Sequence, residues 1–183
     1  LLKSERDKTL KVERLMHAKR YSLALDRNWC KGCGLCVELC PREAISLKGV
    51  VRPAEGRADP PQIDVDVERC NYCGVCNAIC PFGAMSLEIG GERKIPVVAS
   101  ESFPRLVRDV KVNAERCDLG CLGSGDACPL GLIKVYALTP DGKEIRDVSS
   151  VENRGLLKVK VDVDLEHCPC CRICEFIFPS GAV

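Results

Sequence analysis

Apolar and polar residues alternate in four short runs along the chain, and a cysteine-rich segment follows each run. Alternation with a period of two is typical of a strand that buries one face. The pattern predicts lead-in strands at residues 21–25, 63–67, 110–112 and 157–163. Apolar runs after the first three cysteine-rich segments predict return strands at residues 46–51, 86–89 and 134–138.

The cysteine-rich segments define four repeats. Their first cysteines are Cys30, Cys70, Cys117 and Cys168, so the intervals between them are 40, 47 and 51 residues. Intervals of this length are typical of a repeated structural unit. A proline and a short apolar tail close every segment, which predicts a unit of strand, loop, single helical turn and strand. Such an α+β unit is too small to fold without bound metal.

Glycine, proline and charged residues are concentrated between the second and third repeats, which indicates a domain boundary. We therefore expect a two-repeat domain at residues 28–92, a linker at 93–106 and a second two-repeat domain at 107–183. Two further segments of similar composition, 52–62 and 139–155, are expected to be surface loops.

Charge and hydropathy exclude several classes of protein. Residues 1–27 are locally basic and are expected to form an N-terminal arm that faces solvent or a partner. The net charge of the whole chain is only +1, so no general field favours binding to nucleic acid. No apolar run approaches the roughly 18 residues that a membrane span needs.

Fifteen of the 183 residues are cysteines. Their number is odd, they are bunched at short spacings, and no apolar signal-like stretch opens the chain. These features favour metal binding in a reducing compartment over a disulfide framework, and we expect a cytoplasmic protein.

The first two repeats carry the motif C-x2-C-x2-C-x3-C-P without a departure. Its cysteines are Cys30, Cys33, Cys36 and Cys40 in the first repeat, and Cys70, Cys73, Cys76 and Cys80 in the second. The short spacing wraps the chain tightly around a cofactor, where Gly32, Gly34 and Gly74 would let backbone amides approach an anionic cluster. Zinc is the alternative cofactor, but a zinc ribbon requires neither the third cysteine of the motif nor the closing Cys-Pro.

The two complete motifs resemble those of bacterial two-cluster ferredoxins. The resemblance implies an α+β fold of tandem ferredoxin-like domains, with small strands and short helices around [4Fe-4S] clusters. It also implies that the fourth cysteine of each motif binds the cluster of the other motif. The implied ligand sets are Cys30, Cys33, Cys36 and Cys80 for one cluster, and Cys70, Cys73, Cys76 and Cys40 for the second.

The third and fourth repeats depart from the motif. The third places Ser124 where the third cysteine is expected, and the fourth places Phe178 where the closing cysteine is expected. By the same crossing rule, one cluster keeps a complete set of ligands, Cys168, Cys171, Cys174 and Cys128. The other keeps only Cys117 and Cys121, so these two are doubtful metal ligands.

Counting ligands in this way predicts three clusters. A fourth cluster is the alternative, in which Ser124, Asp118, Asp126 or the additional Cys170 completes the site, because oxygen ligands can replace one thiolate.

The sequence contains no nucleophile with a base, no recognisable carboxylate pair and no phosphate-binding glycine loop. We therefore expect an electron-transfer subunit of a larger oxidoreductase, without a substrate site of its own. The alternative function is purely structural, in which the clusters only stabilise the small domains.

Short segments outside the cysteines, at residues 6–10, 95–98, 101–104 and 110–112, resemble the polyferredoxin subunits of archaeal formylmethanofuran dehydrogenase. This resemblance implies a molybdenum- or tungsten-containing catalytic partner in methanogenesis, and electron exchange with heterodisulfide reductase. A polyferredoxin of an energy-converting hydrogenase is the other candidate of this class.

Overall fold

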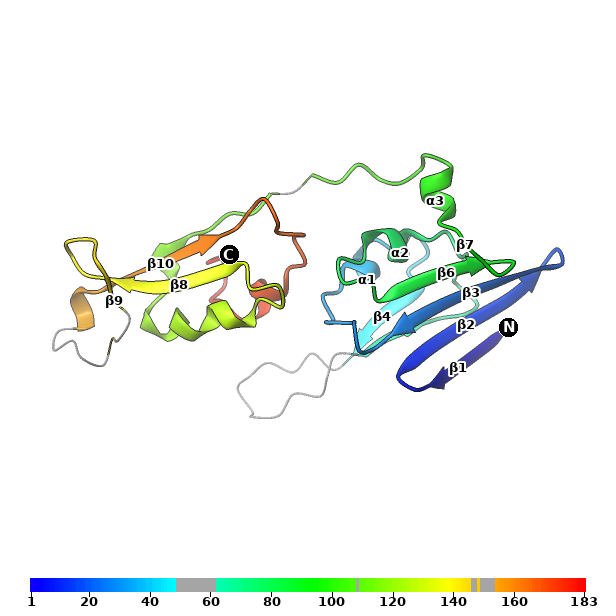
Figure 1. The fold of residues 1–183 in the computed structure, drawn as a ribbon, viewed down its shortest axis with the longest axis horizontal. Coiled ribbons are helices and arrows are strands. Elements are labelled where there is room, and N and C mark those ends of the chain that lie inside the picture. The colour runs from blue at the N-terminus through cyan, green and yellow to red at the C-terminus, as the bar shows by residue number, and fades with distance from the viewer. Residues whose placement is uncertain (49–61, 108, 146–147, 149–153) are drawn as a thin grey trace. The chain divides into compact units, whose positions relative to one another are not determined.

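The computed structural model describes residues 1–48, 62–107, 109–145, 148 and 154–183. The chain forms two compact units, residues 1–106 and 107–183 (Figure 1). Each unit combines a small antiparallel sheet with short helical turns. The described residues therefore have the α+β character that the sequence predicts.

A five-stranded antiparallel sheet forms much of the first unit, in the order β1-β2-β3-β6-β7. Its strands are β1 (Leu2–Arg6), β2 (Thr9–Met16), β3 (Lys19–Asp26), β6 (Met85–Ile89) and β7 (Glu92–Arg93). Two-residue turns join the first three strands, and both residues of each turn have positive φ. Turns of this kind match the twist of a hairpin.

Residues 1–27 form three strands, in place of the basic arm expected from the sequence. The strand signal is the alternation in β2 and β3 that buries Leu10, Val12, Leu23 and Leu25. Several basic side chains hold the hairpins against the rest of the unit. Arg14 Nη2 donates to the carbonyl oxygen of Val67 at 2.7 Å, and Lys3 Nζ donates to that of Val65 at 2.9 Å. The charge of this segment therefore contributes to folding.

A second, two-stranded sheet pairs β4 (Ile45–Lys48) with β5 (Gln62–Val65). The helices α1 (Leu35–Glu38) and α2 (Val75–Ile79) lie side by side (Figure 1). Ile63, Val65 and Leu87 are almost completely buried in the shared core. The strands predicted at 21–25, 63–67, 46–51 and 86–89 correspond to β3, β5, β4 and β6, although residues 49–51 lie outside the described residues.

The helix α3 (Pro96–Ala99) packs on the first unit, within the segment expected to be a linker. The amide of Val97 donates to the carbonyl oxygen of Cys73 at 3.0 Å, and that of Lys94 donates to Leu87 at 3.2 Å. A proline at the first helical position suits the start of this short helix. The beginning of the segment is therefore attached to the second repeat.

The second unit contains a three-stranded sheet in the order β10-β8-β9. Its strands are β8 (Ile133–Leu138), β9 (Glu144–Ile145) and β10 (Lys158–Val163), and its turns are η2 (Ala114–Arg116), η3 (Leu119–Ala127), η5 (Arg154–Leu156) and η6 (Ile173–Phe176). Cys121, Ile133, Val161, Phe178 and Ala182 form its core.

Two expectations for the second unit differ from the structure. Residues 110–112 form no strand; the chain is instead fixed nearby, where the Asn113 amide donates to the Ala182 carbonyl oxygen at 2.9 Å. Part of the expected loop at 139–155 is ordered as β9, which pairs with β8. Residues 52–61, 146–147 and 149–153 of the two expected loops lie outside the described residues.

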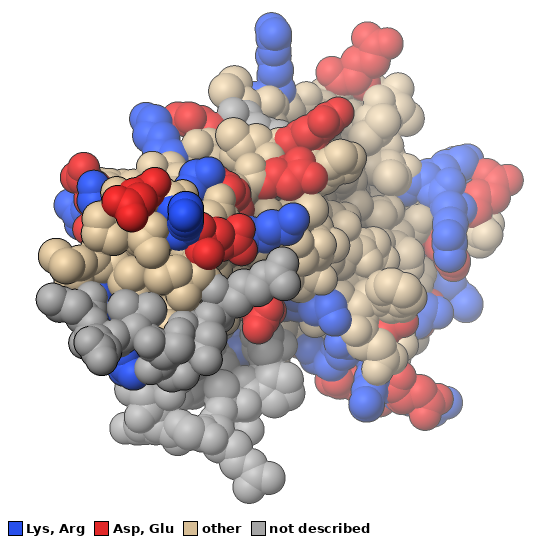
Figure 2. All heavy atoms as spheres, turned by 60° about the vertical axis from the view of Figure 1, so that its left-hand side comes forward, with Lys and Arg blue, Asp and Glu red and all other residues tan. Residues whose placement is uncertain are grey.

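Acidic and basic side chains are interspersed over the described part of the face shown in Figure 2, as the small net charge suggests. None of the described helices has the length and apolar character that a membrane crossing requires.

Candidate iron–sulfur centres

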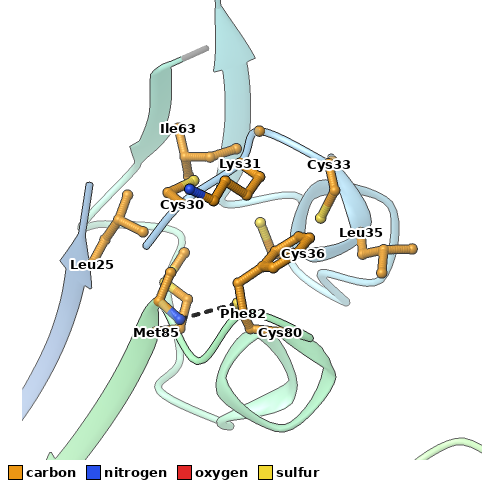
Figure 3. Close-up of a pocket in the computed structure, with 13 residues that line it drawn as sticks. Leu25, Cys30, Lys31, Cys33, Leu35, Cys36, Ile63, Cys80, Phe82 and Met85 are labelled. Atoms are coloured by element: carbon orange, nitrogen blue, oxygen red, sulfur yellow. Dashed lines mark hydrogen bonds between the residues drawn. The ribbon is translucent and has the colours of Figure 1, made fainter. Parts of the chain in front are cut away.

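Four cysteines of the first unit line one cavity, although they come from two different repeats. They are Cys30, Cys33, Cys36 and Cys80 (Figure 3). The cavity encloses about 340 Å³ of empty space, including space open to solvent. Leu25, Ile63 and Met85 supply apolar walls. The structure thus brings together the first set of cysteines that the ferredoxin resemblance implies.

The backbone of the first ligand loop turns sharply around this cavity. The Cys30 amide donates to the carbonyl oxygen of Asp26 at the end of β3, which fixes the start of the loop. Gly32 and Gly34 follow with φ of 66° and 81°, in the left-handed region that favours glycine. Helix α1 begins directly after Gly34. The loop therefore folds back within seven residues and directs three cysteines to one space.

Backbone amides point at the sulfur atoms of this set. The Gly32 amide hydrogen-bonds the sulfur of Cys30, and the Ala84 amide donates to Cys80 Sγ at 3.3 Å (Figure 3, dashed line). Amides directed at thiolates stabilise negative charge on sulfur. This arrangement suits the anionic ligand shell of an iron–sulfur cluster.

A second cavity of about 350 Å³, again including space open to solvent, repeats the arrangement. It is lined by Cys40, Cys70, Cys73 and Cys76. The Ala44 amide donates to Cys40 Sγ at 3.3 Å, and the Tyr72 amide hydrogen-bonds the sulfur of Cys70. Tyr72 and Gly74 have φ of 56° and 85°. The second implied set is therefore also brought together, in a loop of the same backbone conformation.

Gly74 is required for a second reason besides its positive φ. A Cβ atom on Gly74 would lie 3.0 Å from Ile95 Cγ2, which is closer than side chains normally approach. The equivalent atom on Gly34 would lie 3.8 Å from Leu47 Cδ2, an ordinary contact. The residues just before α3 therefore lie directly against the second ligand loop.

Burial disfavours the thiolate form of these cysteines when no metal is bound. It raises the pKa of the Cys36 thiol to about 12, and it raises the pKa of the Cys76 thiol far above its usual range. Burial likewise raises the pKa of Cys30 and of Cys70. Iron binding can keep these buried cysteines deprotonated, because a metal binds the thiolate form. Four convergent thiols, sulfur-directed amides and apolar walls fit a [4Fe-4S] cluster, which supplies one-electron redox chemistry when bound.

In the second unit, the structure brings together Cys128, Cys168, Cys171 and Cys174. Burial raises the pKa of Cys171, and the nearby sulfurs of Cys128 and Cys168 raise it further. The pKa of Cys174 is raised by burial and then by Cys171 and Cys168. The Leu132 amide donates to Cys128 Sγ at 3.4 Å, as the equivalent amides do in the first unit.

The fourth repeat keeps the backbone conformation of the complete ligand loops. Cys170 and Arg172 have φ of 55° and 65°, at the positions of Gly32 and Gly34. Cys170 thus occupies a turn position between ligand positions. This agrees with the alignment in which Cys168, Cys171 and Cys174 are the three close ligands.

The third repeat has a different backbone. Its segment from Leu119 to Ala127 is the 3₁₀ helix η3, and no residue from 117 to 128, all of which are described, has positive φ. Cys121 is buried and packs in one cluster with Phe178, which is only 5% exposed. Cys117 lies beside Cys121; burial and this neighbour raise the pKa of Cys117 to about 11.

The oxygen groups considered as additional ligands have other surroundings. Asp118 accepts a hydrogen bond from the Gly120 amide at 2.9 Å, Asp126 is exposed, and Ser124 lies within η3. The exposed Arg116 side chain, next to Cys117 in the sequence, donates to the Ser180 carbonyl oxygen at 2.9 Å.

Sequence reasoning missed two residues near the second centre. Tyr72 is 2% exposed and packs against Tyr21 with a ring separation of 5.6 Å. Ile95 lies against Gly74. Tyr72 stands inside the motif, so an aromatic residue between two ligands was an available signal. Ile95 has no such signal, because it lies in a segment whose composition indicates a linker.

Comparison with known proteins defines the class of this site. Residues 29–84 match the family described as the 4Fe-4S dicluster domain. They contain both complete motifs, and this part of the chain is a ferredoxin-like 4Fe-4S domain. Among curated proteins, none matches the chain.

A solved structure extends the similarity beyond this domain. The chain is 30% identical to a chain of the formate dehydrogenase, heterodisulfide reductase and formylmethanofuran dehydrogenase complex from Methanospirillum hungatei, with a TM-score of 0.50. The match covers 99% of the present chain and 59% of the other, so the present chain spans less than two thirds of that relative.

Proposed function

We propose that this protein is an electron-transfer polyferredoxin subunit that relays electrons through [4Fe-4S] clusters to or from a larger oxidoreductase. The observation that carries the proposal is the crossing of the two ligand sets, in which Cys80 joins the first cavity and Cys40 joins the second. Crossing holds the two centres in one small domain, close to each other. A domain that only needed metal to fold would have no use for two neighbouring one-electron centres.

The chain's own residues provide three things for this function. The twelve cysteines of the three sets would bind iron, the sulfur-directed amides would stabilise the anionic centres, and apolar residues such as Ile63 and Leu87 would limit the access of water. These factors set the potential of an iron–sulfur centre. In this proposal the chain is a non-catalytic subunit without a substrate site of its own.

We further propose three clusters, two in the first unit and one in the second, which would make residues 107–183 a degenerate two-cluster domain. Two observations support this count. Phe178 is buried at the position of the expected closing cysteine, and η3 is a 3₁₀ helix in place of the left-handed turns of the complete ligand loops.

The partner is proposed to be a formylmethanofuran dehydrogenase complex with a molybdenum or tungsten centre, with heterodisulfide reductase as the source or acceptor of electrons. The similarity to a chain of such a complex supports this assignment. A cytoplasmic location fits the absence of disulfides among the fifteen cysteines, all of which are described.

Anaerobic preparation followed by iron and sulfide analysis tests the proposal. We expect about twelve iron and about twelve sulfide atoms per chain, and a reversible electron paramagnetic resonance signal on reduction by dithionite. Zinc in place of iron would overturn the cofactor assignment. Iron without a reversible signal would show that the clusters are structural.

A further inference from the structure

The two centres of the first unit have ligand loops of the same backbone conformation. The two loops differ in the residues that pack over them. The second loop is covered, because α3 is hydrogen-bonded to Cys73, Ile95 lies against Gly74, and Tyr72 is buried. Arg69, the residue before Cys70, is held in an ion pair with Glu43 at 2.9 Å. The second ligand loop is thus more deeply covered by the chain than the first.

The first centre carries a different set of side chains. Trp29, the residue before Cys30 and the equivalent of Arg69, is 62% exposed. Phe82 and Lys31 line the cavity itself together with Cys30 and Cys36 (Figure 3). A large aromatic side chain held in solvent next to a redox centre is typical of a surface that a partner covers, since aromatic residues are enriched in the centres of protein interfaces.

Two cations lie close to the first centre. Arg27 and Lys31 are the cations that act on Cys30. Arg27 is paired with Glu5 at 2.5 Å, whereas no described carboxylate lies at ion-pair distance from Lys31, which is exposed. The surface therefore presents two aromatic side chains, Trp29 and Phe82, and one cation, Lys31, that pairs with no described carboxylate. A partner that fits it has an acidic rim around its own redox group.

We propose that Trp29, Lys31 and Phe82 form a docking surface for an acidic one-electron carrier protein, so that electrons enter or leave the first unit at the first centre. This proposal rests on the electron-transfer function proposed above. In the reducing direction, the carrier loses one electron and the present chain gains it. No covalent bond forms and no proton is transferred. Attraction by Lys31 raises the rate of encounter, and burial of Trp29 stabilises the complex.

The test uses the full chain with its clusters, and a small acidic bacterial-type ferredoxin, reduced beforehand, as the probe. Trp29→Ala and Lys31→Gln are compared with Leu15→Ala and Lys19→Gln. Leu15 is 72% exposed and Lys19 is exposed, and both lie at the opposite end of the β2–β3 hairpin from Cys30. Lys19→Gln thus matches Lys31→Gln in side chain and charge, and Leu15→Ala, like Trp29→Ala, removes an exposed apolar side chain. Stopped-flow absorbance gives the second-order rate constant, and equilibrium titration gives Kd.

We expect Lys31→Gln to lower the rate constant about threefold at low ionic strength, and the difference to disappear in high salt. Trp29→Ala should raise Kd about tenfold or more. The two control variants should match the wild type. Reduction by dithionite, which needs no docking, should be the same for all five proteins.

Equal rate constants and Kd values for all variants, with normal reduction by dithionite, would overturn the docking surface and leave the electron-transfer function intact. Faster reaction of Lys31→Gln, which would indicate a basic carrier, would overturn it as well. Failure of dithionite to reduce any of the proteins would instead contradict the electron-transfer function.

Discussion

The amide of Val97 donates a hydrogen bond to the carbonyl oxygen of Cys73 at 3.0 Å, and this single bond joins α3 to the ligand loop of the second centre. Ile95 lies next to it, so close to Gly74 that a Cβ atom there would be 3.0 Å from its Cγ2. The segment after the second repeat therefore acts as a cover for the second centre. It also makes Gly74 more sensitive to substitution than Gly34.

Gly74→Ala should weaken the second centre more than Gly34→Ala weakens the first. Both substitutions place alanine at a positive φ, which costs about 1 kcal/mol. Only Gly74→Ala adds a clash with Ile95, and we expect this clash to add about 1–3 kcal/mol. The measurement is thermal unfolding of the anaerobic protein, together with the rate of iron release to a chelator. Ile95→Ala in the Gly74→Ala background should recover part of the loss; no recovery would rule out the clash as its cause.

Replacement of Cys80 should damage the first centre, although Cys80 belongs to the second motif. The physical reason is its position in the cavity with Cys30, Cys33 and Cys36. Cys40→Ala should damage the second centre in the same crossed manner. Spectra of the two variants, compared with those of Cys33→Ala and Cys73→Ala, show which centre each residue serves. Cys80→Ala should resemble Cys33→Ala, and a resemblance to Cys73→Ala would mean that each motif binds its own cluster.

The ligand loops are the part of the structure that sequence alone predicts best. Short spacings and glycine at left-handed positions are local properties, so the motif determines the conformation around Gly32 and Gly34. The N-terminal hairpins were missed because a high density of charge in residues 1–27 outweighed the period-two burial of Leu10 and Val12. The hydrogen bond from Arg14 to Val67 joins residues that are distant in sequence, so no local pattern reveals it.

The third repeat shows a further limit of sequence reasoning. Counting ligands identified Ser124 and Phe178 as the positions of two missing thiolates. The count could not predict that η3 would contain no residue with positive φ, unlike the other ligand loops. The glycines at 120, 123 and 125 could each adopt a positive φ. Cys121 and Phe178 share one core cluster although more than fifty residues separate them in sequence, and only the structure reveals this.

Phe178→Ala should destabilise the second unit by about 3–4 kcal/mol, because the ring is buried among Cys121, Ile133 and Val161 and its removal leaves a cavity. Phe176→Ala is the matched control, since Phe176 is 53% exposed and its removal should change the free energy of unfolding by less than about 0.5 kcal/mol. Anaerobic thermal unfolding measures both. Equal effects of the two substitutions would show that Phe178 is not a core residue of the folded protein.

Alkylation of the folded, anaerobic protein should label Cys117 before Cys121, because Cys121 is only 3% exposed and Cys117 is partly accessible. The pH dependence should be unusual. The thiolate is the reactive form, and the pKa of Cys117 is raised to about 11 by burial and by Cys121. Its labelling rate should therefore rise about tenfold per pH unit from pH 7 to 10. An ordinary exposed thiol, with a pKa near 8.5, should instead approach a constant rate above about pH 9.

Mass spectrometry of peptides after short labelling times gives the rate for each cysteine, and a small cysteine peptide serves as the reference thiol. The proposed iron ligands should remain unlabelled while the clusters are intact. Protection of both Cys117 and Cys121 at every pH, together with about sixteen iron atoms per chain, would show that a fourth cluster is bound there. Labelling of Cys117 with about twelve iron atoms would instead leave the third repeat as a packed structural module, with one cluster in the second unit.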